Sequence, residues 1–92
     1  MLNGGYAKVR NIEIGGKKYK VELAETEKQK VKGLMHVKNL PKNEGMLFIY
    51  DTPQTVYFWM KDTLIPLDII FIDEDYEVIS VYKGKPNDET LV

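Results

Sequence analysis

Residues 58–73 form a mostly apolar run that constrains the fold of this chain more than any other segment. The run encloses one lysine and two aspartates, Lys61, Asp62 and Asp68, and it ends at a third aspartate, Asp73. An unpaired charge is costly to bury, so these groups are expected to have partners or a functional role. The run therefore predicts a well-packed segment whose few polar groups either have partners or belong to a functional site.

Pro66 divides this run into a connection and a strand. Proline is tolerated where a strand begins but not in its middle, which predicts a connection over residues 62–66 and a strand over residues 67–72. That strand is apolar on both sides apart from Asp68. Such a pattern is typical of a central strand that is covered on both faces.

The strand predicted over residues 55–60 has two different faces. Tyr57 and Trp59 lie on one face, and the apolar residues that alternate with them lie on the other. One face is expected to belong to the core. The other either presents Tyr57 and Trp59 beside Lys61, as a platform for a sugar, a base or a partner protein, or is covered by a second layer.

A β-hairpin is predicted near the N-terminus. Residues 9–14 and 17–23 flank Gly15-Gly16, which suits a two-residue turn with positive φ. That turn sets a register in which Ile14 pairs with Lys17, Ile12 with Tyr19 and Arg10 with Val21, and in which Glu13 faces Lys18.

A short helix is predicted near residues 26–36. Thr26 followed by Gln29 is typical of a capping box. Three apolar residues at helical spacing form a narrow stripe: Val31, Leu34 and Met35. Gly33 inside the helix would cost about 1 kcal/mol relative to alanine, which predicts a close backbone approach to a neighbouring segment.

Together these patterns predict one mainly β domain over residues 1–92, a β-sandwich or a partly open barrel with one short α-helix. Further strands are predicted over residues 46–50 and 76–82, and residues 84–92 are expected to form a loop or tail. No stretch reaches the roughly 18 apolar residues that span a bilayer, and the N-terminus does not resemble a signal peptide. We therefore expect a cytoplasmic protein without a membrane span.

Composition excludes several kinds of site. The chain has no cysteine and one histidine, His36, which excludes disulfides, thiolate nucleophiles and His-rich metal clusters within one chain. We expect no metal and no cofactor.

Charge is distributed unevenly along the chain. Residues 1–42 hold ten Lys/Arg against four Glu, and residues 43–92 hold three Lys against ten Asp/Glu. This asymmetry favours attraction between halves or between copies over nucleic-acid binding.

Several blocks of the chain resemble the prokaryotic domain of unknown function 192 family. They are Gly33-Leu34-Met35, Leu40-Pro41, Gly45-Met46-Leu47-Phe48, Phe58-Trp59-Met60-Lys61, Thr63, Ile65-Pro66-Leu67-Asp68 and Ile72-Asp73. The resemblance implies a small, mostly β domain with a short helix, and it implies no reaction.

Three features of the chain depart from the family pattern. His36-Val37 replaces an aromatic or apolar residue followed by arginine, and Asp62 replaces the usual asparagine. The chain ends at Val92, where family members usually continue into a further strand. We expect from this a shortened variant or a truncated chain with an open sheet edge, which could recruit a second copy.

The ligand-binding candidates are Trp59, Tyr57, Lys61, Asp62, Thr63, Asp68 and Glu44. A lysine beside carboxylates can hold an anionic ligand or serve as an acid or base. Alternatively, Asp68 and Thr63 cap the connection and Lys61 neutralises Asp62 or Asp68. No residue is assigned a catalytic role.

These observations favour a non-catalytic binding module for a small polar ligand or a protein partner, with its site around Trp59 and Asp68. The first alternative is a hydrolase or lyase that uses Asp68 with Lys61 or Glu44. The second is nucleic-acid binding through the basic N-terminal half.

Overall fold

Consecutive glycines form the first hairpin of the protein. The structure is a computed structural model that describes residues 8–92. Strands β1 (Val9–Ile14) and β2 (Lys17–Ala24) are antiparallel, and the turn between them has φ of 57° at Gly15 and 79° at Gly16. Both values are positive, as a two-residue hairpin turn requires. The predicted register is confirmed, including the pairing of Glu13 with Lys18.

A helix connects β2 to a parallel neighbour. Helix α1 (Glu27–Lys32) begins with the predicted capping box. The Gln29 N–H donates to Thr26 Oγ1 over 3.1 Å, and the Thr26 N–H donates to Gln29 Oε1 over 3.0 Å. Strand β3 (Glu44–Phe48) then pairs with β2 in parallel. Parallel neighbours need a crossover connection of this kind, so β3 completes a sheet of order β1-β2-β3.

The helix ends earlier than the apolar stripe predicts. Gly33 takes φ of 47° and stops α1 after Lys32. Leu34 and Met35 follow the helix, so the predicted stripe does not form, and Val31 is 70% exposed. The close approach predicted for Gly33 is confirmed, since a Cβ there would lie 3.2 Å from Cζ of Phe48.

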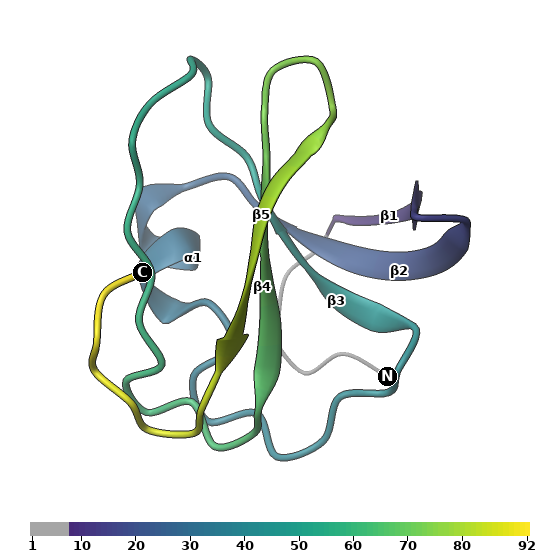
Figure 1. Ribbon diagram of the computed structural model, residues 1–92. Coiled ribbons are helices and arrows are strands. Elements are labelled where there is room, and N and C mark those ends of the chain that lie inside the picture. The colour runs from purple at the N-terminus through teal and green to yellow at the C-terminus, as the bar shows by residue number, and fades with distance from the viewer. Residues whose placement is uncertain (1–7) are drawn as a thin grey trace.

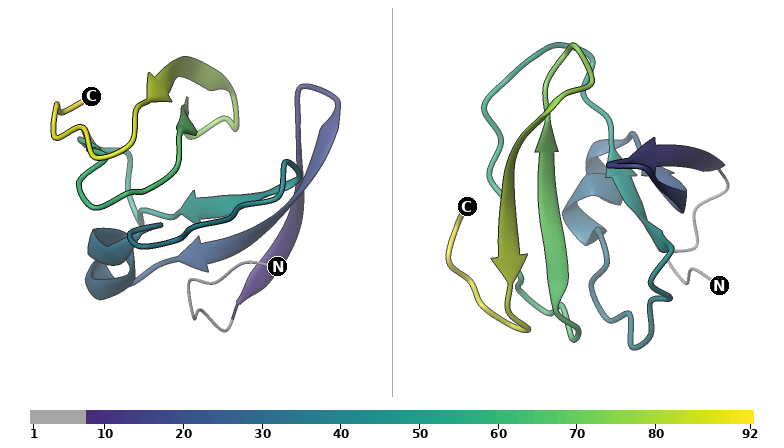
Figure 2. Two further views of the ribbon diagram at one scale, coloured as in Figure 1. Left: turned by 90° about the horizontal axis from the view of Figure 1, so that it is seen from below. Right: turned by 45° about the vertical axis from the view of Figure 1, so that its right-hand side comes forward.

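A second hairpin forms the other layer. Strands β4 (Leu67–Ile72) and β5 (Val78–Gly84) pair in an antiparallel, two-stranded sheet. The turn between them is held by Asp73, whose Oδ1 accepts N–H bonds from Asp75 and Glu77, each 2.9 Å long. Figure 1 and Figure 2 show this hairpin lying crosswise against the three-stranded sheet.

The prediction that β4 is a central strand covered on both faces is wrong. Its one neighbour in the described chain, residues 8–92, is β5. Asp68 lies on the exposed side of this hairpin and pairs with Lys83 directly across from it, with Nζ and Oδ1 2.9 Å apart. The cross-strand lysine therefore supplies a partner of the kind that the apolar pattern around Asp68 predicts.

Residues 55–60 are extended but belong to neither sheet. Their neighbour is the C-terminal segment, which returns beside them (Figure 1). Phe58 and Val92 exchange two backbone hydrogen bonds of 3.1 and 2.9 Å, and the Met60 N–H donates to the Asp88 carbonyl over 2.7 Å. These contacts do not form a continuous ladder, which explains why the predicted strand is absent although its alternation persists.

A chain of aromatic rings joins the two layers. Phe58 packs edge-on against Phe48 of β3 at 4.9 Å and against Phe71 of β4 at 5.7 Å, and Phe71 continues to Tyr82 of β5 at 5.7 Å. Edge-to-face geometry at such distances is favourable for aromatic pairs. The predicted fold class is confirmed as five strands in two sheets with one short helix, without barrel closure among the described residues. No helix in residues 8–92 is long and apolar enough to cross a membrane.

Candidate functional site

The alternation around Trp59 separates a buried face from an open one. Met60 is buried and Phe58 lies between the layers, whereas Tyr57 is 69% exposed and Trp59 is 42% exposed. Of the two arrangements left open by the sequence, the structure has the exposed aromatic pair. Its position next to α1 makes it one wall of a cavity.

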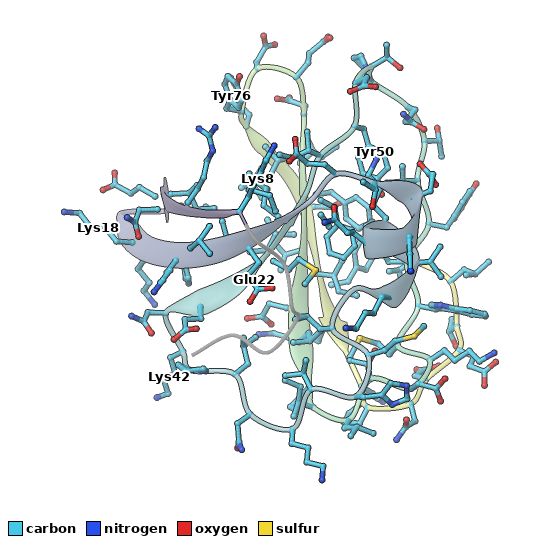
Figure 3. All side chains as sticks on the ribbon, turned by 180° about the vertical axis from the view of Figure 1, so that it is seen from behind. Lys8, Lys18, Glu22, Lys42, Tyr50 and Tyr76 are labelled. Carbon is cyan, nitrogen blue, oxygen red and sulfur yellow. The ribbon has the colours of Figure 1, made fainter. Side chains whose placement is uncertain are left out.

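We call this cavity, which lies between α1 and residues 57–63, the aromatic cavity. Its volume is about 300 Å³. Five aromatic side chains line it, together with residues of α1 and the turn that follows. The lining residues are Glu27, Lys30, Val31, Lys32, Gly33, Met35, Phe48, Tyr50, Tyr57, Phe58, Trp59 and Thr63. Tyr50 lies close beside α1, as Figure 3 shows.

Lysine ammonium groups lie over two of the aromatic rings. Lys30 Nζ is 3.9 Å from the ring centroid of Tyr50, and Lys61 Nζ is 5.2 Å from that of Trp59. Lys30 Nζ is also 3.9 Å from Glu27 Oε1. Such cation–π contacts hold positive charge beside an apolar surface. The cavity lining thus carries two lysines (Lys30 and Lys32) against one glutamate (Glu27), and Lys61 lies next to it in the adjoining turn with Asp62.

Burial favours the neutral phenol of Tyr50. Its pKa is raised above the ordinary value of 10.0, mainly by burial and further by the carboxylate of Glu27. Both effects oppose the negative phenolate. The Tyr50 hydroxyl is therefore a hydrogen-bond donor throughout the neutral pH range.

We expect Tyr50 to ionise above pH 10.0. Phenolate absorbance of the wild type minus that of Tyr50→Phe isolates this group. Because the folded state binds the proton more tightly, the contribution of Tyr50 to stability is complete below pH 10.0 and is lost as pH rises through its raised pKa. Glu27→Gln should lower the titration midpoint of Tyr50, but by less than half of the total increase in its pKa, because burial is the larger cause. A difference curve with its midpoint at or below 10.0 would contradict the prediction.

A tight turn after Trp59 orients the cavity wall. Thr63 is buried, and its hydroxyl donates to the Lys61 carbonyl over 3.2 Å. Asp62 has φ of 53° and its carbonyl accepts the N–H of His36, itself at φ of 65°, over 2.9 Å. Left-handed backbone is uncommon outside glycine and favours Asn over most residues. Asp62 thus ties this turn to the segment after α1 through its backbone.

The C-terminal segment supports the same turn from the other side. The Asn87 N–H donates to the Thr63 carbonyl over 2.9 Å. Asp88 accepts a 2.9 Å bond at Oδ1 from the Thr90 N–H. This backbone bond, helped by the Thr90 side chain, lowers the pKa of Asp88 below its ordinary value of 3.8. The position of Trp59 therefore depends on residues far away in the sequence.

The structure brings together some of the sequence-predicted residues and leaves others apart. Trp59, Tyr57 and Thr63 line the cavity, and Lys61 and Asp62 lie in the adjoining turn. Two candidates do not line it: Asp68, which contacts Lys83, and Glu44, which lies on β3 opposite Lys20. In the structural alternative Lys61 was expected to neutralise Asp62 or Asp68, whereas the structure has Lys61 over Trp59 and Asp68 in contact with Lys83.

Sequence reasoning missed three polar residues. Lys30 reaches the cavity from α1 and Tyr50 from the segment just after β3, and only the crossover between β2 and β3 brings them together. Glu22 lies within β2, is 4% exposed, and its Oε2 has no hydrogen-bond partner within residues 8–92. The sequence signal that could have identified Glu22 is its position between two apolar residues, Val21 and Leu23. Across the described part of the chain, no three His, Asp or Glu side chains group as metal ligands would.

The family model for domain of unknown function 192, described as an uncharacterized ACR, matches residues 9–92. The chain belongs to this family. The resemblance inferred from the sequence blocks is therefore confirmed. The matched residues include both sheets and the lining of the aromatic cavity.

Two solved structures are similar to this member of the family. One is a protein of unknown function from Novosphingobium aromaticivorans, with 32% identity and a TM-score of 0.79 over 97% of this chain and 74% of that chain. The other, from Sinorhizobium meliloti, is described as a candidate transcription regulator. It has 33% identity and a TM-score of 0.80 over 91% of this chain and 67% of that chain. No curated protein matches the chain.

Proposed function

We propose that this protein is a non-catalytic module that binds a small planar ligand with an anionic group in the aromatic cavity. The observation that carries the proposal is the combination of exposed Tyr57 and Trp59 with lysines held over aromatic rings. A volume of about 300 Å³ lies at the small end of ligand sites, which commonly have aromatic linings and few polar groups.

The exposed rings supply the apolar part of recognition. Tyr57 and Trp59 alternate along one extended segment, so their side chains lie on the same side of it. Large rings present much contact area and lose little conformational freedom on binding. A planar ligand that stacks on Trp59 would thus gain burial without a large rearrangement of the protein.

The lysines supply the polar part. Lys30 is mostly buried against Tyr50, and Lys61 lies over Trp59. An ammonium group beside a partly desolvated surface attracts an anion more strongly than one in bulk water. Glu27 and the neutral Tyr50 hydroxyl add one acceptor and one donor, which suits a ligand with further polar groups.

The enzyme alternative has less support. A hydrolase or lyase using Asp68 with Lys61 or Glu44 needs these groups within hydrogen-bond reach of one substrate. Asp68 is instead engaged by Lys83, and Lys61 by Trp59. Binding needs only the stacking surface and the charges that line the cavity.

The test uses Trp59, which is the single tryptophan of the chain. We expect adenosine monophosphate, a planar ring with a phosphate, to quench its fluorescence saturably. Lys30→Gln should weaken binding by about tenfold, the loss of one charge-assisted hydrogen bond. Lys18→Gln, on the distant β1–β2 hairpin, is the matched control and should bind as the wild type does.

Two further probes separate the parts of the ligand. Adenosine and inorganic phosphate, each alone, should bind more weakly than the monophosphate, and Trp59→Leu should lose binding by calorimetry while keeping a cooperative unfolding transition. Failure of adenosine monophosphate and of phenyl phosphate to saturate the protein, or equal binding by Lys30→Gln and the wild type, would refute the proposal.

A second candidate function is nucleic-acid binding through the basic N-terminal half. It is favoured by the description of the Sinorhizobium meliloti relative and by exposed basic residues on the first hairpin, Arg10, Lys17, Lys18 and Lys20. Figure 3 shows Lys18 on that hairpin, on the opposite side of the view from Tyr50. A gel shift at low salt tests it, because phosphate contacts are strongest there.

A further inference from the structure

We propose that β5 is a self-association edge, through which a second copy of this chain pairs antiparallel to extend the β4–β5 sheet. This interface is separate from the aromatic cavity and does not depend on the ligand proposed for it. Three features of the β4–β5 hairpin support it: apolar exposure, an open strand edge and a charge gradient along its length.

Apolar exposure is concentrated on β5. Ile79 is 65% exposed and Val81 is 54% exposed, and Val78 and Tyr82 are exposed as well. Residues 78–82 contain no charge and no proline, and most of them favour strands. Segments of this kind pair readily with other strands unless they are protected.

The strand also has an open backbone edge. Within the described chain β5 pairs with β4 alone, and no other described backbone group bonds to residues 78–84. Unpaired N–H and C=O groups on such an edge form a template for another strand. β4 is a weaker candidate because most of its residues are half-buried, whereas most of β5 is exposed.

Charge selects the occupant and its direction. The turn end of the hairpin carries Asp73, Glu74, Asp75 and Glu77, and the opposite end carries Lys83 and Lys85 with Asp68 and Asp88 nearby. In a parallel pair the four acids of each copy would meet, which is destabilising. In an antiparallel pair the acids of one copy face an end of the other copy where two lysines offset two aspartates, which avoids this repulsion in an arrangement with two-fold symmetry.

The size of the contact implies weak association. One strand edge with a few apolar side chains buries less area than a standard stable interface. We therefore expect a dimer whose population rises with concentration. A strand edge that binds unlike proteins does not need a charge arrangement that fits a second copy of the same chain.

Sedimentation velocity over two decades of protein concentration tests the association. We expect a reversible monomer–dimer equilibrium for the wild type. Val81→Lys places like charges close to the two-fold axis and should weaken it by at least about tenfold. Leu64→Lys, at an exposed apolar residue outside both β5 and the lining of the aromatic cavity, is the matched control and should leave it unchanged.

Cysteine cross-linking tests the geometry, since the natural chain has no cysteine. Single substitutions at residues 79, 80, 81 and 82 should cross-link best at one position near the axis if the strands are antiparallel. A parallel pair would cross-link equally at all four, and Val9→Cys on β1 should not cross-link. A wild type that stays monomeric at the highest concentration, or a Val81→Lys variant that associates as the wild type does, would overturn the proposal.

Discussion

Phe58→Ala is expected to lower the free energy of unfolding by about 3 kcal/mol, the low end of the range for buried aromatic truncations. Phe58 is the ring through which the two sheets touch, with Phe48 on one side and Phe71 on the other. Its removal leaves a void between layers and forfeits two edge-to-face contacts. Urea unfolding followed by far-ultraviolet circular dichroism measures the change.

The neighbouring residue provides the control. Tyr57→Ala removes an aromatic ring of similar size from the same segment, but that ring is largely exposed. A change within about 0.5 kcal/mol is expected there. Equal losses in the two variants would contradict the assignment of Phe58 to the contact between layers, and would indicate that the segment contributes through its backbone alone.

Glu22→Met is expected to raise the free energy of unfolding by about 1–3 kcal/mol. Glu22 of β2 is 4% exposed, and its buried Oε2 has no hydrogen-bond partner within residues 8–92. Such an oxygen loses its bonds to water on folding and gains none in return. Methionine has a similar length and shape, so it removes this cost without leaving a cavity.

The same substitution at an exposed glutamate on this hairpin distinguishes an effect of burial from an effect of strand propensity. Glu13→Met replaces a residue that faces Lys18 across β1 and β2, outside the core. It should change stability by no more than about 0.5 kcal/mol, because Glu13 is exposed and surface substitutions usually have small effects. Thermal and urea unfolding compare the two variants. A loss of stability in Glu22→Met would show that the carboxylate is satisfied in solution.

Local signals in the sequence predicted the features that depend on neighbours in the chain. Gly15-Gly16 set the register of the first hairpin because few other residues take positive φ at both turn positions. Thr26 and Gln29 located the start of α1, since a capping box needs only residues three apart. The alternation around Trp59 separated the buried face from the open one, although the segment joins no sheet.

Contacts between distant segments decided the rest. The position of Asp68 on an exposed face depends on Lys83 and on the absence of a second strand beside β4 in the described chain. The early end of α1 depends on Gly33, whose positive φ and closeness to Phe48 could not be read from the apolar stripe. Periodicity reports which side a residue faces, and it does not report which segment covers that side.

The aromatic cavity illustrates this division. Trp59, Tyr57 and Thr63 were found from their own segment, whereas Lys30 and Tyr50 join them only through the crossover between β2 and β3. Local patterns predicted the first hairpin, the start of α1 and the family, because these depend on short-range sterics and residue order. The tertiary structure alone decided which charges pair and which rings enclose a cavity, because both depend on through-space distances between segments that the chain order leaves open.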